Sequence, residues 1–178
     1  MARVIALCLH HRDHYSTGHY RQVFGYEAYH WSIMIMSEDG EGDCHAYDAT
    51  DASSIDPETF RLINPTMDWW FRFKENVDPT RSSKLIGRIV IGAVPDDDLT
   101  EDHFREFFSN IPLPVRNREP QESCVTWAVN AILALQEEGW VWPFDIDQFK
   151  DWALAYGDDR MLGEDSEQPD ITRYNMEE

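Results

Sequence analysis

Hydrophobic periodicity changes once along this chain, and the change constrains the fold more than any other feature. Up to residue 94 the apolar residues form runs of strand length, which predict strands at 3–11, 29–36, 44–50, 69–77 and 84–94. From residue 99 onward apolar residues recur at helical spacing, which predicts helices at 99–111, 123–139 and 145–158. Strands followed by helices, rather than alternating with them, indicate an α+β domain.

Length and composition fit one domain. The chain has 178 residues, of which 42% are hydrophobic, and this is enough for a single core. We expect the domain to span residues 1–162. An acidic, flexible tail is expected at 163–178.

The charge balance is strongly acidic, with 15 Lys and Arg against 34 Asp and Glu and a net charge of −19. Such a charge repels phosphate backbones and anionic membrane surfaces, so we expect no nucleic-acid partner. No apolar run approaches the roughly 20 residues of a membrane span. The chain has three cysteines, and its short apolar run at 4–9 lacks a signal-peptide pattern, so we expect a cytoplasmic protein with free thiols.

A cysteine at the start of the helix predicted at 123–139 is the main candidate for chemistry. Ser123 suits the N-cap position, which places Cys124 in the first helical turn. Unpaired amide groups at a helix N-terminus stabilise a thiolate, the nucleophilic form of cysteine. Such a nucleophile also needs a base within hydrogen-bond reach and a group that orients the base. The alternative is an inert core cysteine, which is the commoner fate of a buried thiol.

Two histidines in the hairpin predicted at 29–50 are candidates for these two roles. His30 shares a strand face with Ser32, so we expect it to project toward a helix packed on the sheet. His45 lies on the returning strand, near enough to orient His30. Asp48 is the alternative orienting group, although strand alternation places it on the opposite face from His45. We expect His45 to fill the role.

The order of these motifs resembles a known group of enzymes. The segments YHWSIMI, HAYDAT and ESCVTWAVNAILAL resemble a His-Trp strand, a His strand and an Asn-Cys-x-x-Trp/Phe helix start. That pattern belongs to the circularly permuted papain-like cysteine enzymes, the lecithin:retinol acyltransferase-like and NlpC-type group, and to a set of small fungal proteins. The resemblance covers about residues 3–155. One departure is Ser123, which stands where the family has asparagine.

The resemblance implies both a fold and a reaction. It implies an antiparallel sheet packed against a central helix, with the nucleophile Cys124 at the helix N-terminus, His30 as base and His45 as the third polar residue. The implied reaction is acyl transfer through a thioester. Water as acceptor makes the protein an amide or ester hydrolase; an amine makes it an acyl- or aminoacyl-transferase that forms amide bonds, for example in fungal small-molecule biosynthesis.

Two alternatives remain open from the residues alone. One is a non-catalytic binding module on the same fold, and the other is a non-covalent enzyme that shapes a small molecule within an aromatic cleft. For the acyl-transfer enzyme we expect a small-molecule or peptide substrate, no cofactor and no metal. The side chains expected to contact this substrate are Trp31, Trp127 and Ser123; Trp69 and Trp70 are further aromatic candidates.

Four histidines cluster after the first predicted strand, at His10, His11, His14 and His19. A histidine cluster can bind metal, but these residues do not follow a definite ligand spacing. We therefore expect a polar loop, at 10–29, that rims the cleft.

Overall fold

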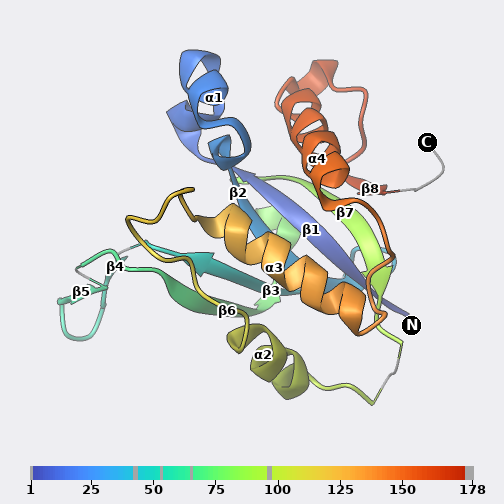
Figure 1. The fold of residues 1–178 in the computed structure, drawn as a ribbon, viewed down its shortest axis with the longest axis horizontal. Helices are drawn as coiled ribbons and strands as arrows, with labels where there is room; N and C mark the ends of the chain where they lie inside the picture. Colours follow the sequence, from blue (N-terminus) through green and yellow to red (C-terminus); the bar gives the residue numbers. More distant parts are fainter. Residues whose placement is uncertain (1, 42–43, 53, 65, 96–97, 175–178) are drawn as a thin grey trace.

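The computed structural model describes residues 2–41, 44–52, 54–64, 66–95 and 98–174. It is an α+β fold in which a mostly antiparallel sheet packs against helices (Figure 1). Within these ranges the chain forms eight strands: β1 (Arg3–His11), β2 (Tyr29–Ser37), β3 (Cys44–Thr50), β4 (Ser54–Ile55), β5 (Leu62–Ile63), β6 (Trp70–Val77), β7 (Leu85–Ala93) and β8 (Ile171–Arg173).

Six of these strands form one sheet, in the order β6-β3-β2-β1-β7-β8. The first strand, β1, lies near the centre, where it pairs antiparallel with both β2 and β7. The hairpin of β2 and β3 is in the register Ile33↔Tyr47 and Met34↔Ala46. Only the pairing of β7 with β8 is parallel within this sheet. The predicted antiparallel core of the sheet is therefore confirmed.

The three helices predicted in the second half are formed, and each begins at a capping side chain, with Ser123 in the predicted position. Thr100, Ser123 and Asp145 each accept a hydrogen bond from a backbone amide of the first turn. No helix in the described ranges is long and apolar enough to cross a membrane. The α-helices are α1 (Gly18–Phe24), α2 (Glu101–Ser109), α3 (Cys124–Glu137) and α4 (Ile146–Arg160).

One face of the sheet and α3 form the main core. Alternation along β2 turns Trp31, Ile33 and Ile35 toward this core, where they meet buried residues of α3 such as Ala128 and Ile132. Figure 1 shows α3 lying across this face, with α2 beside it. A smaller apolar cluster covers part of the opposite face; it includes Cys8, Met34, Met36 and Cys44. The sheet therefore has one face fully covered by helices and one face partly free.

Two segments differ from the expectation. The stretch expected to be a loop at 10–29 folds into α1 and two short 3₁₀ helices, η1 (Asp13–Ser16) and η2 (Gly25–Ala28). The segment expected to be a flexible tail forms η4 (Gly163–Asp165) and β8, so the domain extends to at least Tyr174 among the described residues. The ring of Tyr174 packs against three aromatic rings from 144–152, which fixes this end of the chain.

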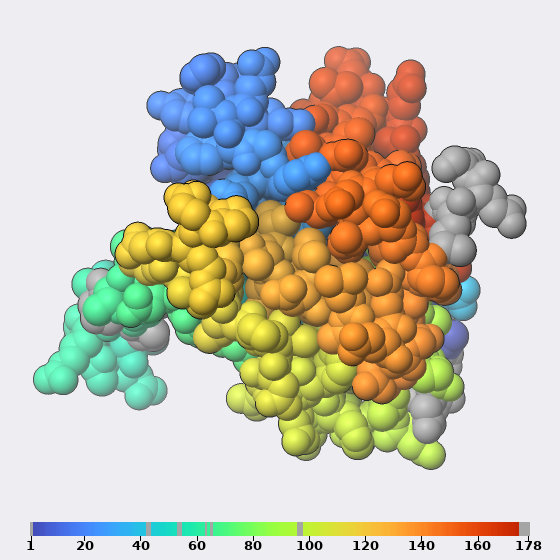
Figure 2. Space-filling model, viewed as in Figure 1, coloured from blue at the N-terminus to red at the C-terminus, as the bar shows by residue number. Residues whose placement is uncertain are grey.

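A small hairpin of β4 and β5 projects from the body of the protein (Figure 2). Next to it the connection at 111–123 runs over the surface toward the start of α3. Arg116 of this connection donates to the backbone carbonyl of Met67, which follows the hairpin. The connection leads into the N-terminus of α3, where Cys124 lies.

Candidate active site

Cys124 is the first residue of α3, and two hydrogen bonds close the helix start around it. The Ser123 hydroxyl oxygen accepts from the Val125 amide at 3.2 Å. The Ser123 amide donates to the Thr126 hydroxyl at 2.9 Å, which completes a capping box. Cys124 is 5% exposed and lines a pocket of about 370 Å³. The thiol is therefore fixed at a helix N-terminus with access to a cavity, as the sequence predicts.

His30 is brought to Cys124 at the end of the sheet. Its neighbour Trp31 belongs to the face that packs on α3, so His30 and Ser32 lie on the other face; the expectation that this face meets the helix is wrong. His30 is the second residue of β2, and from this strand end its ring comes close enough to Cys124 for the two groups to interact. Both residues line this pocket of about 370 Å³, which is the smaller of two pockets that His30 lines.

The charge state of His30 follows from these neighbours. Burial disfavours the imidazolium, but the negative charge of Cys124 and the hydrogen bonds to Asp48 and Cys124 outweigh burial. Together they raise the pKa of His30 to about 9. His30 is therefore a cation at neutral pH, and it lies between two acidic groups.

Asp48 is the group that holds the His30 ring. Its Oδ2 lies 2.6 Å from His30 Nε2, which leaves Nδ1 as the ring nitrogen free for the thiol. Arg72, on the neighbouring strand β6, binds both carboxylate oxygens of Asp48, with Nε–Oδ1 at 3.0 Å and Nη2–Oδ2 at 2.6 Å. Burial alone would raise the pKa of Asp48, but the hydrogen bonds from His30 and Arg72 lower it well below its usual range. Asp48 is therefore a fixed, ionised partner for His30.

His45 does not occupy this position, so the expectation that it orients His30 is wrong. Its Nε2 lies 2.8 Å from Glu101 Oε1 at the start of α2, and its ring stacks on Phe73. The physical reason is strand alternation in β3, which turns His45 toward the helices and Asp48 toward the face of His30. Asp48, the alternative from the sequence, takes the place instead.

The walls of the smaller pocket also differ in part from expectation. Ser123 lines it, as expected, but Trp31 and Trp127 are completely buried in the core and do not. Both side chains are large and mostly apolar, so burial in the core between the sheet and the helices stabilises them more than exposure at a pocket wall. The aromatic walls are instead Phe24 and Trp69, and the connection before α3 contributes Arg116, Asn117, Gln121 and Glu122.

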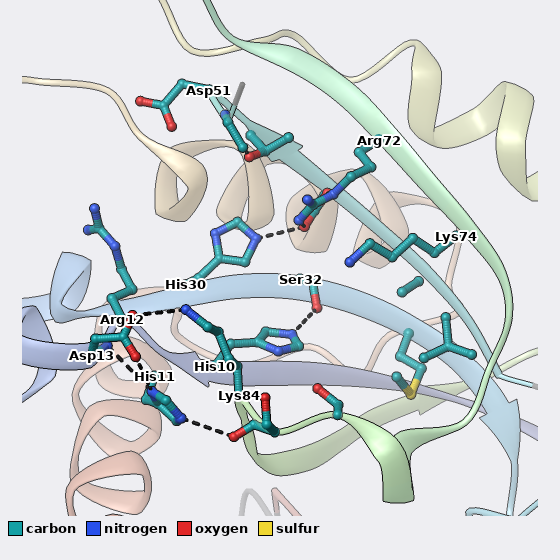
Figure 3. A pocket seen from close by; sticks show the side chains of 18 of the residues that line it. His10, His11, Arg12, Asp13, His30, Ser32, Asp51, Arg72, Lys74 and Lys84 are labelled. Carbon is teal, nitrogen blue, oxygen red and sulfur yellow. Dashed lines mark hydrogen bonds and ion pairs between the residues drawn. The ribbon is translucent and has the colours of Figure 1, made fainter. Parts of the chain in front are cut away.

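A second, larger pocket of about 670 Å³ opens on the free face of the sheet. Figure 3 shows His30 within it, near His10 and Ser32. His10 Nε2 and the Ser32 hydroxyl are 3.0 Å apart, and burial followed by the charge of His30 lowers the pKa of His10 to about 3. The two pockets adjoin, because four residues line both of them: Arg12, His30, Thr50 and Asp51.

The other predicted candidates lie outside this arrangement. His14 and His19 belong to η1 and α1, where His14 packs against the rings of Tyr15 and Tyr20. Across the described residues, no group of three or more His, Cys, Asp or Glu side chains is arranged to hold a metal ion. Cys8 and Cys44 are free thiols, as predicted, and the structure places both in the core, where burial raises the pKa of Cys8 to about 12.

Comparison with known proteins gives a family. A search of curated proteins and a search of solved structures each found no match. The model of a family described as "Family of unknown function (DUF6540)" matches residues 19–141. This range contains Cys124, His30 and Asp48 and covers more than half of the chain, so the protein belongs to that family.

Proposed function

We propose that the protein is a cysteine-dependent acyl-transfer enzyme that works through a thioester on Cys124. The observation that carries this proposal is the series Cys124, His30 and Asp48: His30 interacts with the thiol at the N-terminus of α3 and is hydrogen-bonded to Asp48, and Cys124 and His30 line one pocket. A nucleophile, a base and a group that orients the base are the three parts that acyl transfer to a thiol requires.

In the proposed resting state the proton resides on His30 and Cys124 is a thiolate. The thiolate attacks the carbonyl carbon of the substrate, a C–S bond forms, and the carbonyl electron pair moves to the oxygen. Amide groups at the start of α3 can stabilise this oxyanion, and the side chain of Gln121, which lines the same pocket, is a candidate second donor. When the intermediate collapses, the bond to the leaving group breaks and His30 donates its proton to that group.

The second half of the reaction returns the enzyme to its starting state. His30, now neutral, accepts a proton from the acceptor as its oxygen or nitrogen attacks the thioester. The C–S bond breaks and the thiolate is restored beside the imidazolium. Water as acceptor makes the enzyme a hydrolase, and an amine makes it an acyl- or aminoacyl-transferase. Both use the same three residues.

Asp48 and Arg72 support this cycle without touching the substrate carbonyl. Asp48 fixes the His30 ring so that Nδ1 faces the thiol, and its charge stabilises the imidazolium. Arg72 holds Asp48 with two hydrogen bonds and keeps it ionised despite burial. The two residues are therefore positioning residues.

The proposal agrees with the resemblance to permuted papain-like enzymes. The strand that carries the histidine precedes the helix that carries the cysteine, and the α+β sheet packs on this helix. We infer a common arrangement of the site with that group, with Asp48 as its third member. A small-molecule or peptide acyl substrate and a reducing compartment such as the cytoplasm suit the pocket size and the three free thiols.

An activated ester tests this proposal. We expect the wild type to release a burst of p-nitrophenol from p-nitrophenyl acetate, with an amplitude equal to the enzyme concentration, and we expect Cys124→Ala to lose the burst. Cys44→Ala is the matched control, because it removes a buried thiol outside the pocket and should keep the burst. Repeating the reaction with an added amine and identifying the product distinguishes a hydrolase from a transferase. A burst that persists in Cys124→Ala would contradict the proposal.

A further inference from the structure

The larger pocket concentrates positive charge in an acidic protein. The chain carries a net charge of −19 and has only 15 Lys and Arg. Five of these 15 line this one pocket, against three aspartates. The five cations are Arg12, Arg72, Lys74, Arg81 and Lys84.

Three of the five cations are neutralised by carboxylates of the protein. Arg72 pairs with Asp48 through two hydrogen bonds. Lys84 Nζ lies 2.9 Å from Asp13 Oδ2, and Arg81 Nε lies 3.4 Å from Asp78 Oδ2. These pairs account for Asp13 and Asp48 and leave Asp51 as the third carboxylate of the pocket wall.

The other two cations, Lys74 and Arg12, make no ion pair with a carboxylate of the described residues. Lys74 lies on β6 on the same face as Arg72; burial, and then the charge of Arg72, lower its pKa, and Asp48 offsets this only in part. Arg12 Nη1 donates to the Glu27 carbonyl oxygen at 2.5 Å, and its guanidinium lies over the Tyr15 ring. Neither contact cancels a positive charge. Each cation therefore retains a charge that a ligand can neutralise.

The position of these two cations relates them to Cys124. Figure 3 shows Arg12 and Lys74 on opposite sides of His30. Arg12 and His30 also line the smaller pocket, which contains Cys124. The larger pocket therefore adjoins the site of Cys124, and a molecule that spans both pockets would have its carbonyl in the smaller one and its other end in the larger one.

We propose that the larger pocket binds an anionic group of the acyl substrate, a carboxylate or a phosphate, with Lys74 as its main charge partner and Arg12 at the junction. A polyanion such as a nucleic acid is repelled by the acidic chain as a whole, whereas a small anion experiences mainly the local charges of the pocket. That the anion belongs to an acyl substrate rests on the proposed function. That the pocket binds small anions does not.

Anion binding is tested on the full chain carrying Cys124→Ser, so that no covalent step is required. The probes are inorganic phosphate, succinate and the neutral succinamide, and the ring signals of His10 and His11, which line the pocket, report binding by NMR. We expect saturable shifts with phosphate, with succinate or with both, and none with succinamide. The anion that binds more tightly identifies the substrate group as a phosphate or a carboxylate.

Two lysine variants make the test specific. Lys74→Gln should weaken anion binding about tenfold or more, because a charge-assisted contact is lost. Lys150→Gln removes the same charge from α4, outside the pocket, and should bind as the parent protein does. Lys74→Arg should retain most of the affinity and shows that the pocket remains folded.

Each result bears on one of the two proposals. Absence of saturable binding for both anions, or equal affinity in the two glutamine variants, would overturn the anion site. A p-nitrophenol burst that depends on Cys124 would still support acyl transfer in that case. Anion binding that depends on Lys74, without such a burst, would support the anion site and contradict the proposed reaction.

Discussion

Asp48 Oδ2 lies 2.6 Å from His30 Nε2, although the two residues are on different strands and 18 positions apart in the chain. The contact occupies Nε2 of the ring and leaves Nδ1 available to Cys124. The same carboxylate also accepts two hydrogen bonds from Arg72. The roles proposed for these residues lead to separate predictions.

Asp48→Asn should slow acylation by at least about tenfold while the protein stays folded, because the amide cannot stabilise the imidazolium and can favour the wrong tautomer. The burst rate with p-nitrophenyl acetate measures this. His45→Ala is the matched control: it removes a ring that pairs with Glu101 and stacks on Phe73, so it should lower the melting temperature and leave the burst rate unchanged. A reduced burst rate in His45→Ala together with a wild-type burst rate in Asp48→Asn would show that His45, and not Asp48, orients His30.

Strand alternation in the sequence places His45 and Asp48 on opposite faces of the sheet. It does not say which of the two shares a face with His30, because that depends on the register of the hairpin. The observed pairing of Ile33 with Tyr47 places even-numbered residues of both strands on one face, which groups His30 with Asp48 and excludes His45. Hairpin register depends on turn geometry, which the motifs alone do not give. The caps of the helices were predictable because each depends on a local side chain at one position, as at Ser123.

Other differences arise from tertiary packing. The spacing of tryptophans in a sequence does not distinguish a pocket wall from a core position, and both Trp31 and Trp127 are completely buried in the core. The strand β8 comes from an acidic segment with little strand character. It forms because β7 offers an edge, and because Tyr156 donates to the Pro169 carbonyl oxygen just before it.

Arg72→Gln should lower the free energy of unfolding by about 1–3 kcal/mol at neutral pH, because it leaves the buried Asp48 carboxylate with one partner fewer. The low pKa of Asp48 contributes stability above its unfolded value of about 3.9, and this contribution is lost as the pH falls below it. The variant should therefore show a smaller loss of stability between pH 7 and about pH 3 than the wild type. Urea unfolding at both pH values measures these free energies of unfolding. Arg72→Lys keeps the charge but not the two hydrogen bonds, so its stability should lie between those of the wild type and Arg72→Gln. Equal stability of all three proteins would contradict the role of Arg72 as the partner that stabilises Asp48.

The ring of His30 should titrate near pH 9 in the wild type and at lower pH in Cys124→Ala, because the charge and the hydrogen bond of Cys124 raise its pKa. Cys8→Ala removes a buried thiol outside the site and should leave this titration unchanged. Since the folded pKa is above the unfolded value of about 6.5, the stabilisation is complete below pH 6.5 and is lost as the pH rises through about 9. NMR of the His30 ring follows the titration. An identical midpoint in the wild type and Cys124→Ala would show that the two groups do not interact.

Ser123→Ala should destabilise the protein by about 1 kcal/mol, because the Val125 amide loses its acceptor at the helix start. It should also slow acylation, because Cys124 is the next residue. Ser123→Asn restores a capping side chain and supplies the residue found in the resembling enzymes, so it should recover most of the stability. Thermal unfolding and the burst rate together check this. A stable but inactive Ser123→Asn would indicate that the serine hydroxyl has a role of its own in the pocket.

Peptide mapping of the acylated protein by mass spectrometry is the most direct test of the central claim. After brief reaction with p-nitrophenyl acetate and an acid quench, the account predicts one acetyl group on the peptide that contains Cys124, removable by hydroxylamine as a thioester should be. Cys8, whose pKa is raised to about 12 by burial, and the buried Cys44 should remain unmodified in the same sample, and His30→Ala should acquire the group much more slowly. An acetyl group on either of these two thiols, or equal labelling of Cys124 in the wild type and His30→Ala, would contradict the account.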